Sequence, residues 1–428
     1  MLRLPIENTL DREEKIMAEQ FTTLASLTVD GKGSYGIGAS AVPFSKDLYT
    51  YLRITDIKDD GTLNLQDLKS VDDEKASEYL LKPNDIVFAR TGASTGRNYF
   101  YDGMDGEFVY AGFLIKFSID EKKVNPKYIK YFCQSKRYKD WINSFNTGST
   151  RGNINAQTLG KMPIPLIERT AQDALVSILS SIDEKIKKNN EINNNLEQQA
   201  QALFKEWFID NPENIYWSTG TFRELIQSTL NGDWGKETPT GNNIEKVYCI
   251  RGADIPEVKA GNKGKMPTRY ILPKNLANKK LEAGDIVVEI SGGSPTQSTG
   301  RCTAITQSLL DRYDSSMVCT NFCKAIKPKN GYSLFVYYYW QYLYEKSVFF
   351  SYENGTTGIK NLDFTGFIET EPIIVPPFDK VQAFDDYCKS IFNQVFANGK
   401  QSEQLSSLRD TLLPRLMFGE LDVANIDI

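Results

Sequence analysis

Two long segments of the chain carry apolar residues at helical spacing. From Glu168 to Phe208 the sequence contains neither proline nor glycine. Positions alternately four and three residues apart form a heptad seam at Leu175, Leu179, Ile182, Ile186, Asn189, Asn193, Leu196, Ala200, Leu203 and Trp207. This pattern predicts one long helix whose seam is apolar at both ends and polar in the middle. Because about forty residues of helix reach about 60 Å, the seam needs a partner along its length.

The second segment, Phe378 to Met417, offers that partner. It keeps a similar spacing at Val381, Phe384, Cys388, Ile391, Val395, Asn398, Ser402, Leu405 and Leu412. Its middle is also polar, so an antiparallel pair would bring the two polar centres together. A buried asparagine fixes register at some cost in stability. Gly399 is a candidate break in this second helix.

The remaining sequence contains the same landmarks twice, in the same order. They are an Arg-x-x-Asp-Ile phrase, an Asp-Ile-Val strand followed by Ser-Thr-Gly-Arg, a Gly-Thr-rich loop, and a proline-marked strand end. The paired ranges are 53–57 with 251–255, 85–97 with 285–301, 146–154 with 353–362, and 162–166 with 373–377. Offsets of roughly 200 residues predict a duplicated domain with its helix, because solenoid repeats have periods of about 20–50 residues. Within the first phrase of each copy, Arg53 and Arg251 could be functional or could pair with Asp56 and Asp254.

Each copy mixes strand and helix patterns. Residues 85–90, 108–119 and 285–290 are rich in β-branched and aromatic residues, which predicts strands. Residues 126–145 and 333–350 have helical periodicity. The predicted fold class is α+β, with two repeated mixed α/β domains separated by two long helices that pack as an antiparallel coiled coil with pseudo-twofold symmetry. The predicted limits are 1–166 and 210–376 for the domains, 167–209 for the first helix, and 377–428 for the second helix and tail.

Composition narrows the possible functions. The chain has 428 residues, a net charge of −5 and no histidine, which excludes histidine-based catalysis and histidine metal sites. No apolar run approaches a membrane span, and the N-terminus turns acidic where a secretory signal would turn apolar, so a cytoplasmic protein is expected. The six cysteines are then expected to be reduced, buried thiols, and no zinc site is indicated.

The sequence gives no convincing enzyme site. Residues 375–378 resemble the Pro-Pro-aromatic signature of aminomethyltransferases, but Val375 replaces the polar residue that would hold the target amino group. Residues 31–36 match Gly-x-Gly-x-x-Gly without a preceding strand, which is a weak signal. Between residues 116 and 161 there are ten Lys and Arg against three acids. That stretch is either a solvated helix face or a surface for phosphates.

Two long phrases in the chain resemble a known family. Residues 164–208, from IPLIERTAQDALVSILSSIDEK to ALFKEWF, and residues 405–421, LSSLRDTLLPRLMFGEL, are similar to the two helices of specificity subunits of Type I restriction-modification systems. The family layout of recognition domain, helix, recognition domain and helix covers essentially the whole chain. It therefore explains why the same phrases occur twice.

The resemblance implies a non-catalytic subunit. In this family each domain reads one half of a bipartite, asymmetric double-stranded DNA site, and the helix pair sets the gap and docks partners. The implied partners are two modification (methyltransferase) subunits and restriction (ATP-dependent translocase and nuclease) subunits, with no membrane. No cofactor is expected in this chain; S-adenosylmethionine, ATP and Mg²⁺ would belong to the partner subunits. A coiled-coil scaffold with two ligand-binding domains unrelated to DNA is the alternative.

Base reading requires short polar or guanidinium groups on loops held by a rigid sheet. The candidate DNA-binding residues of the first domain are Arg90, Thr91, Ser94, Thr95, Arg97, Ser149, Thr150 and Arg151. Those of the second domain are Ser291, Ser294, Gln297, Ser298, Thr299, Arg301, Thr356, Thr357 and Lys360. Ordinary turns also favour Gly, Ser and Thr, so each loop has a structural interpretation as well. The bases read and the gap length do not follow from these residue types.

Overall fold

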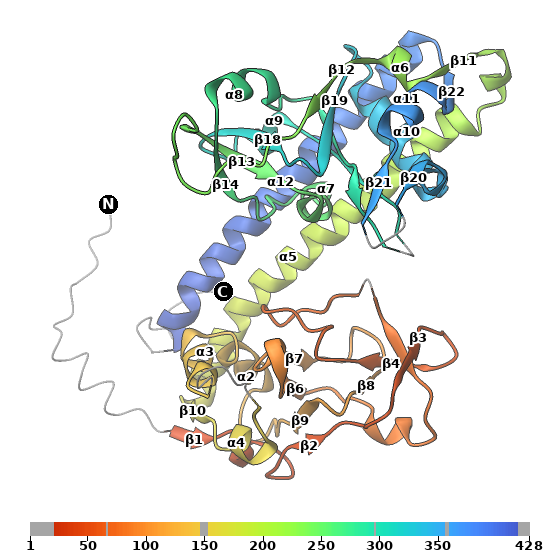
Figure 1. Ribbon diagram of the computed structural model, residues 1–428. Helices are drawn as coiled ribbons and strands as arrows, with labels where there is room; N and C mark the ends of the chain where they lie inside the picture. Colours follow the sequence, from red (N-terminus) through yellow and green to blue (C-terminus); the bar gives the residue numbers. More distant parts are fainter. Residues whose placement is uncertain (1–20, 66, 146–152, 295–296, 356–358, 418–428) are drawn as a thin grey trace. The chain divides into compact units, whose positions relative to one another are not determined.

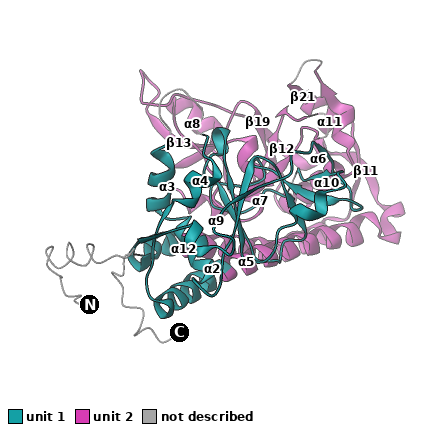
Figure 2. Ribbon diagram, turned by 90° about the horizontal axis from the view of Figure 1, so that it is seen from below, with its two compact units in different colours: residues 1–183, 407–428 teal, residues 184–406 magenta. Residues whose placement is uncertain are grey.

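The computed structural model describes residues 21–65, 67–145, 153–294, 297–355 and 359–417 (Figure 1). The chain divides into two compact units (Figure 2): unit 1 comprises residues 1–183 and 407–428, and unit 2 comprises residues 184–406. Two long helices, α5 (Arg169–Phe204) and α12 (Phe378–Met417), each contribute to both units. The predicted α+β class with repeated mixed domains and two long helices is confirmed. The domain limits at 166, 209 and 376 stay a prediction.

Strand order in unit 1 places β6 at the centre of its first sheet. That sheet has the order β2-β9-β6-β7, formed by Ser34–Tyr35, Leu114–Ser118, Asp85–Ala89 and Asn98–Tyr101. The second sheet has the order β3-β5-β4-β8, formed by Ala41–Pro43, Lys69–Val71, Tyr49–Leu52 and Phe108–Tyr110. Strands β4 and β8 run parallel. A separate ribbon pairs β1 (Phe21–Thr23) with β10 (Pro163–Pro165).

Unit 2 repeats this plan, except that β3 has no counterpart among its described strands. Its first sheet has the order β12-β19-β15-β17, formed by Ile226–Asn231, Cys323–Pro328, Ile286–Glu289 and Cys302–Ala304. Its second sheet has the order β14-β13-β18, formed by Thr268–Ile271, Glu245–Ile250 and Ser316–Cys319, and β13 and β18 run parallel. Strand β11 (Ser218–Thr221) pairs with β22 (Pro372–Val375) as β1 pairs with β10. The duplication predicted from the landmarks is therefore confirmed at the level of topology.

The repeated Arg-x-x-Asp phrase folds identically in the two units. Arg53 donates from Nε and Nη2 to Asp56 at 3.0 and 2.6 Å, and Arg251 makes the same two bonds to Asp254 at 2.9 and 3.0 Å. Each guanidinium also binds the carbonyl oxygen fourteen residues later, of Asp67 and Lys265. These hydrogen bonds raise the pKa of both arginines above the ordinary value. Both arginines therefore fasten a loop, which supports the structural interpretation.

Three predicted elements are shorter than the sequence pattern suggested. The helix expected at 126–145 is two helices, α2 (Pro126–Phe132) and α3 (Lys136–Asn143), because Ser135 caps α3 by accepting from the Tyr138 N–H. The helix expected at 333–350 ends as α10 (Ser333–Glu345), since Ser347 adopts a positive φ of 61°. The strand expected at 108–119 is broken by a turn between β8 and β9.

The remaining helices are short. In unit 1 the structure has α4 (Ala156–Gly160). In unit 2 it has α6 (Phe222–Leu225), α7 (Ile255–Lys259), α8 (Pro273–Lys279), α9 (Gln307–Leu310) and α11 (Phe364–Thr370). Among the described helices, none is long and apolar enough to cross a membrane. All six cysteines are buried free thiols, and burial raises the pKa of Cys249 and Cys302 to about 12.

Helices α5 and α12 run antiparallel with their predicted seams inward. In unit 1, Asp183 of α5 meets Arg409 of α12; in unit 2, Asn193 meets Asn398. All ten predicted seam positions, nine in α5 and Trp207 just beyond it, are buried or half-buried, whereas the neighbouring Asn194 and Asn195 are exposed. Beyond Phe204 the chain continues as a π-helical turn, Lys205–Ile209. The helix pair predicted from the heptad pattern is thus confirmed.

The polar centre of the seam lies in unit 2 and is fully hydrogen-bonded. Asn398 Nδ2 donates to Asn193 Oδ1 at 2.8 Å, and Asn193 Nδ2 donates to the carbonyl oxygens of Val395 and Ala260 at 3.0 and 3.1 Å. Asn189 Nδ2 donates to Ser402 Oγ at 3.2 Å. Such directional bonds are satisfied in one alignment only, so they specify the register of the two helices.

Gly399 does not break α12, contrary to the sequence-based expectation. The helix runs unbroken from Phe378 to Met417. A Cβ at Gly399 would lie 1.9 Å from the carbonyl oxygen of Gly261, which belongs to the loop after α7. Glycine is therefore required at this position because the domain backbone touches the helix there.

Each unit packs its sheet and helices around its own core. In unit 1, α2 buries Tyr128, Tyr131 and Phe132 together with Leu175 and Leu179 of α5. Unit 2 has an aromatic core, formed by Phe204, Phe208, Phe335, Tyr339, Trp340, Phe367 and Phe384. The rings of Phe208 and Phe384 are 5.2 Å apart and nearly perpendicular, a favourable edge-to-face arrangement.

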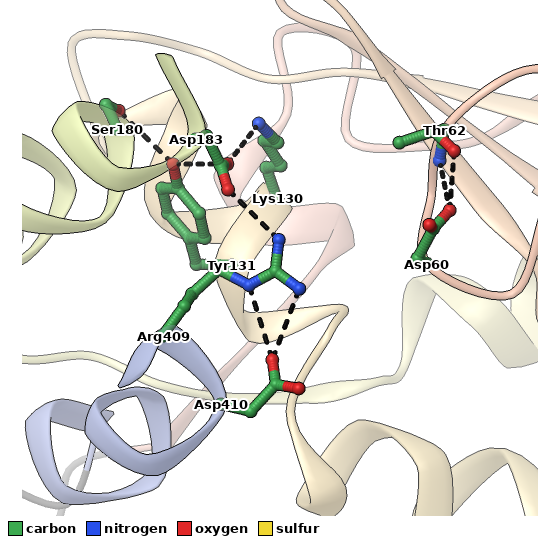
Figure 3. A network of polar contacts seen from close by, with 8 residues as sticks. All are labelled: Asp60, Thr62, Lys130, Tyr131, Ser180, Asp183, Arg409 and Asp410. Carbon is green, nitrogen blue, oxygen red and sulfur yellow. Dashed lines mark hydrogen bonds and ion pairs between the residues drawn. The ribbon is translucent and has the colours of Figure 1, made fainter. Parts of the chain in front are cut away.

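A charged network holds both long helices to α2 in unit 1 (Figure 3). Asp183 accepts from Lys130 Nζ at 3.1 Å, from the Tyr131 hydroxyl at 2.9 Å and from Arg409 Nη1 at 3.1 Å. Burial alone would raise the pKa of Asp183, but the two cations and their hydrogen bonds lower it below the ordinary value. The carboxylate therefore stays ionised and joins three helices.

Candidate nucleic-acid interface

The structure joins the two candidate loops of the first domain. The segment 90–97 leaves β6, turns, and returns as β7. The carbonyl oxygen of its first residue, Arg90, accepts a hydrogen bond from the Ile154 N–H at 2.9 Å. The next residue, Thr91, forms an isolated β-bridge with Asn153. Residues 153–154, which end the second loop, thus lie beside the first loop at the end of β6. Ser149, Thr150 and Arg151 lie outside the described residues.

The side chains of this loop differ in their contacts and in their exposure to solvent. The Arg90 guanidinium lies over the Tyr35 ring at 5.0 Å and donates to Asn153 Oδ1 at 3.4 Å. Its buried Nε finds no acceptor in the described part of the chain. Thr91 and Thr95 are half-buried, whereas Ser94 is buried inside the turn.

Arg97 is fastened at the base of the loop. It donates from Nε to Asp59 Oδ1 at 2.7 Å and from Nη1 to the Ile57 carbonyl oxygen at 3.2 Å. Asp59 is largely exposed, so this pair is open to solvent on one side. A surface pair of this kind is worth about 0–1 kcal/mol and is easily exchanged for a phosphate or a base.

The second domain joins its loops through a small sheet. Strands β16 (Ser291–Gly292), β21 (Lys360–Leu362) and β20 (Glu353–Asn354) pair in the order β16-β21-β20. The segments 291–301 and 353–362 therefore adjoin, as segments 90–97 and 153–154 do in unit 1. Thr356 and Thr357 lie outside the described residues.

Two glutamates that the sequence reasoning missed organise this second site. Arg301 donates to both oxygens of Glu289, at 2.8 and 2.7 Å, and these bonds raise the pKa of Arg301. Glu353 accepts from Thr299 N–H and Oγ1 at 2.6 and 3.0 Å, and from Lys360 Nζ at 2.7 Å. Both glutamates lie in or beside the candidate segments of the sequence, but only the tertiary fold shows which loop residues they bind.

The candidate residues of the second domain also differ in their exposure to solvent. Ser298 and Thr299 are buried within the loop. Ser291 and Ser294 are half-buried, and the Ser291 hydroxyl donates to Asn361. Gln297 is exposed at the tip, where its N–H binds Ser294 Oγ at 3.0 Å. Gln297 is thus an exposed candidate with an amide that can read a base edge, and its side chain also hydrogen-bonds with Tyr344.

Part of the basic stretch 116–161 serves the fold. Lys116 pairs with Asp85 at 3.2 Å and Lys130 with Asp183 at 3.1 Å. Lys122, Lys136, Lys139 and Lys161 remain exposed. Among the described residues, no cluster of three His, Cys, Asp or Glu could hold a metal ion.

The fold and the loops together define a class of protein. It is a duplicated α+β domain on an antiparallel helix pair, in which each copy presents two adjoining polar loops at the end of its central strand. Residues 45–198 match the sequence profile of a protein family described as "Type I restriction modification DNA specificity domain".

Two curated proteins and one solved structure are similar to the chain over most of its length. The chain is 25% identical over 337 residues to the Type I restriction enzyme MjaIX specificity subunit of Methanocaldococcus jannaschii, covering 72% of each chain. It is 20% identical over 409 residues to the Type I restriction enzyme HindI specificity subunit of Haemophilus influenzae, covering 80% of this chain and 87% of that one. The crystal structure of a Type I restriction-modification system S subunit from M. genitalium matches with a TM-score of 0.51 at 17% identity, over 93% of this chain and 96% of that one. Over most of its length the chain is therefore similar to Type I restriction-modification specificity subunits, and residues 45–198 match the family of their DNA specificity domain.

Proposed function

We propose that this chain selects a bipartite DNA sequence, with one half read by each domain and the gap set by the helix pair. The observation that carries the proposal is the duplication of a whole domain with its loops. The two copies keep the same strand order in their first sheet and the same Arg–Asp pair, yet their loops carry different side chains. A shared scaffold with different loops is suited to reading two unlike half-sites at a fixed separation.

The loop chemistry fits base reading. Gln297 can pair with adenine through its amide, and the Arg90 guanidinium can donate to guanine. Arg301 and Arg97 are held by carboxylates, which pre-orients a guanidinium before DNA arrives. All seventeen candidate residues, including the five outside the described residues, stay predictions for contact with bases or phosphates.

The helix pair suits both spacing and docking. Helices α5 and α12 contain 36 and 40 residues, about 54 and 60 Å of rigid rod. Their outward faces are polar and are the proposed docking surface for two modification subunits. Those subunits would use S-adenosylmethionine to methylate adenine, and restriction subunits would use ATP and Mg²⁺. This chain itself would be the non-catalytic subunit, acting in the cytoplasm where the DNA is.

The salt dependence of DNA binding tests this proposal. The full chain, alone and with its modification subunit, would be titrated with duplex DNA at several salt concentrations. Binding to phosphates releases counterions, so affinity should fall steeply between 50 and 200 mM salt, by about a hundredfold or more. A coiled-coil scaffold unrelated to DNA would show no duplex binding at any salt concentration, with or without the modification subunit.

A further inference from the structure

Both domains contain the same exposed phenylalanine in the same turn. In unit 1 the turn Ala111–Leu114 connects β8 to β9 and places Phe113 at its third position. In unit 2 the turn Thr320–Cys323 connects β18 to β19 and places Phe322 there. Each turn is closed by a hydrogen bond from its fourth residue to its first. The Leu114 N–H donates to the Ala111 carbonyl oxygen at 2.8 Å, and the Cys323 N–H donates to the Thr320 carbonyl oxygen at 2.9 Å.

A glycine packs directly against the backbone of each turn. A Cβ at Gly36 would lie 2.2 Å from the Tyr110 carbonyl oxygen, and one at Gly232 would lie 1.8 Å from the Thr320 carbonyl oxygen. Backbone therefore packs directly on backbone in both copies, and the turn has little freedom to move. This close approach accounts for the last glycine of the segment 31–36, which is not part of a nucleotide site.

The two rings point away from the cores. Phe113 is 61% exposed and Phe322 is 60% exposed. Within the described part of the chain, neither ring belongs to the hydrophobic clusters of its unit. A single exposed phenylalanine is unremarkable on a protein surface. The same ring exposed to the same degree on two diverged copies is not explained by packing.

Each ring adjoins a candidate DNA-reading loop. The Phe113 carbonyl oxygen accepts from the Arg90 N–H at 3.1 Å. The Phe322 carbonyl oxygen accepts from the N–H groups of Ile290 and Ser291 at 2.9 and 3.2 Å. These bonds place the phenylalanine beside the first residue of the loop in both domains.

The two domains differ at the residues that flank the exposed phenylalanine but not at the phenylalanine itself. The turn positions before and after the ring differ, with Gly112 and Leu114 in one copy against Asn321 and Cys323 in the other. The loop residue that donates to the turn also differs, Arg90 against Ile290. The ring alone is kept, which points to a contact that both half-sites have in common.

We propose that Phe113 and Phe322 are equivalent DNA-contacting residues, one in each domain, whose rings pack against thymine methyl groups at the base edges. This inference rests on the proposed function. The thymine methyl is the apolar group that a duplex displays in the major groove, and it suits a phenylalanine ring. Excluding water from both surfaces supplies the affinity, and no phosphate contact is involved.

The test measures affinity of the full chain with its modification subunit for a duplex carrying the sequence that this complex methylates. The variants are Phe113→Ala and Phe322→Ala. Matched controls remove an exposed apolar side chain elsewhere in the same unit: Met104→Ala, 74% exposed among acidic residues, and Tyr216→Ala, 83% exposed. A second duplex carries deoxyuridine for thymidine in both half-sites, which deletes only the methyl groups.

The proposal predicts about tenfold weaker binding for each phenylalanine variant and a change below twofold for each control. Deoxyuridine should weaken the wild-type complex but add little to the loss in the double variant. The slope of affinity against salt should not change, because no phosphate contact is removed. Thermal unfolding of the variants should match the wild type, since the rings lie outside the cores.

The outcomes separate this inference from the proposed function. If the wild-type complex binds no duplex, the proposed function fails. If the wild type binds and the phenylalanine variants bind equally well, this inference alone is overturned. Equal sensitivity of wild type and double variant to deoxyuridine would also overturn it, as would a variant whose salt slope falls.

Discussion

The asparagine cluster between the two long helices gives the most quantitative prediction. Asn398 donates to Asn193 Oδ1, and both residues are less than one-tenth exposed. Substitution Asn398→Ala leaves that oxygen buried without its donor, which costs about 1–3 kcal/mol. The higher helix propensity of alanine offsets about 0.5 kcal/mol. The expected loss in free energy of unfolding is therefore about 0.5–2.5 kcal/mol.

The substitution Asn193→Ala should cost more, about 2–3 kcal/mol. It removes the same bond and also the two donated to the carbonyl oxygens of Val395 and Ala260. The double substitution should cost about 1 kcal/mol less than the sum of the single ones, because each single variant already loses the shared bond. Asn194→Ala, at an exposed neighbouring position, should change stability by less than about 0.5 kcal/mol.

Urea unfolding followed by tryptophan fluorescence measures these energies. The signal reports mainly on unit 2, which contains four of the five tryptophans, Trp207, Trp217, Trp234 and Trp340. The midpoint should shift without a change in the slope m. If the costs of the two single substitutions simply add within about 0.3 kcal/mol, the two asparagines are not coupled and the reasoning is refuted.

Four further predictions follow from single side chains. Asp183 has a lowered pKa, so its carboxylate stabilises the fold above the ordinary carboxyl pKa of about 4, and this contribution is lost as the pH falls below that value. In acid titrations of unfolding, Asp183→Asn should therefore lose less stability than the wild type between pH 5 and pH 3. Gly399→Ala should destabilise unit 2 by about 1–3 kcal/mol in the same urea assay, although alanine normally favours a helix, since its Cβ would meet the Gly261 carbonyl oxygen. Phe384→Ala should cost about 3–5 kcal/mol by urea unfolding, because the ring is fully buried among aromatic side chains. Gln297→Ala should relax base preference in one half-site and leave the other unchanged when methylated sites are mapped, whereas Asn278→Ala, an exposed amide on α8, should alter neither.

Local periodicity explains why the helix pair could be predicted from the sequence. The spacing of Leu175, Leu179 and Ile182 is visible over a few turns, and their burial follows from that spacing. The duplication was also visible, because landmarks such as Arg53 and Arg251 are short, ordered and repeated. The strand order was not predicted, and only the structure shows that the first sheets of the two copies share it.

Features set by tertiary contacts could not be predicted in this way. Gly399 was expected to weaken α12, and only the approach of Gly261 gives the reason that a glycine stands there. Glu289 and Glu353 lie at the edges of the candidate loops, but no local pattern predicts that they bind Arg301 and Lys360. The turn at Phe113 was hidden inside an apolar run that looks like one continuous strand.

Mapping of methylated adenines tests the central claim most directly. The full chain would be co-expressed with its modification subunit, and N6-methyladenine would be located across the host DNA by sequencing. A split motif with two unlike halves and one fixed gap is predicted, and Asn193→Leu with Asn398→Leu should loosen the gap while both halves stay the same. A single uninterrupted motif, or no methylation from a well-folded complex with an intact methyltransferase, would contradict the account.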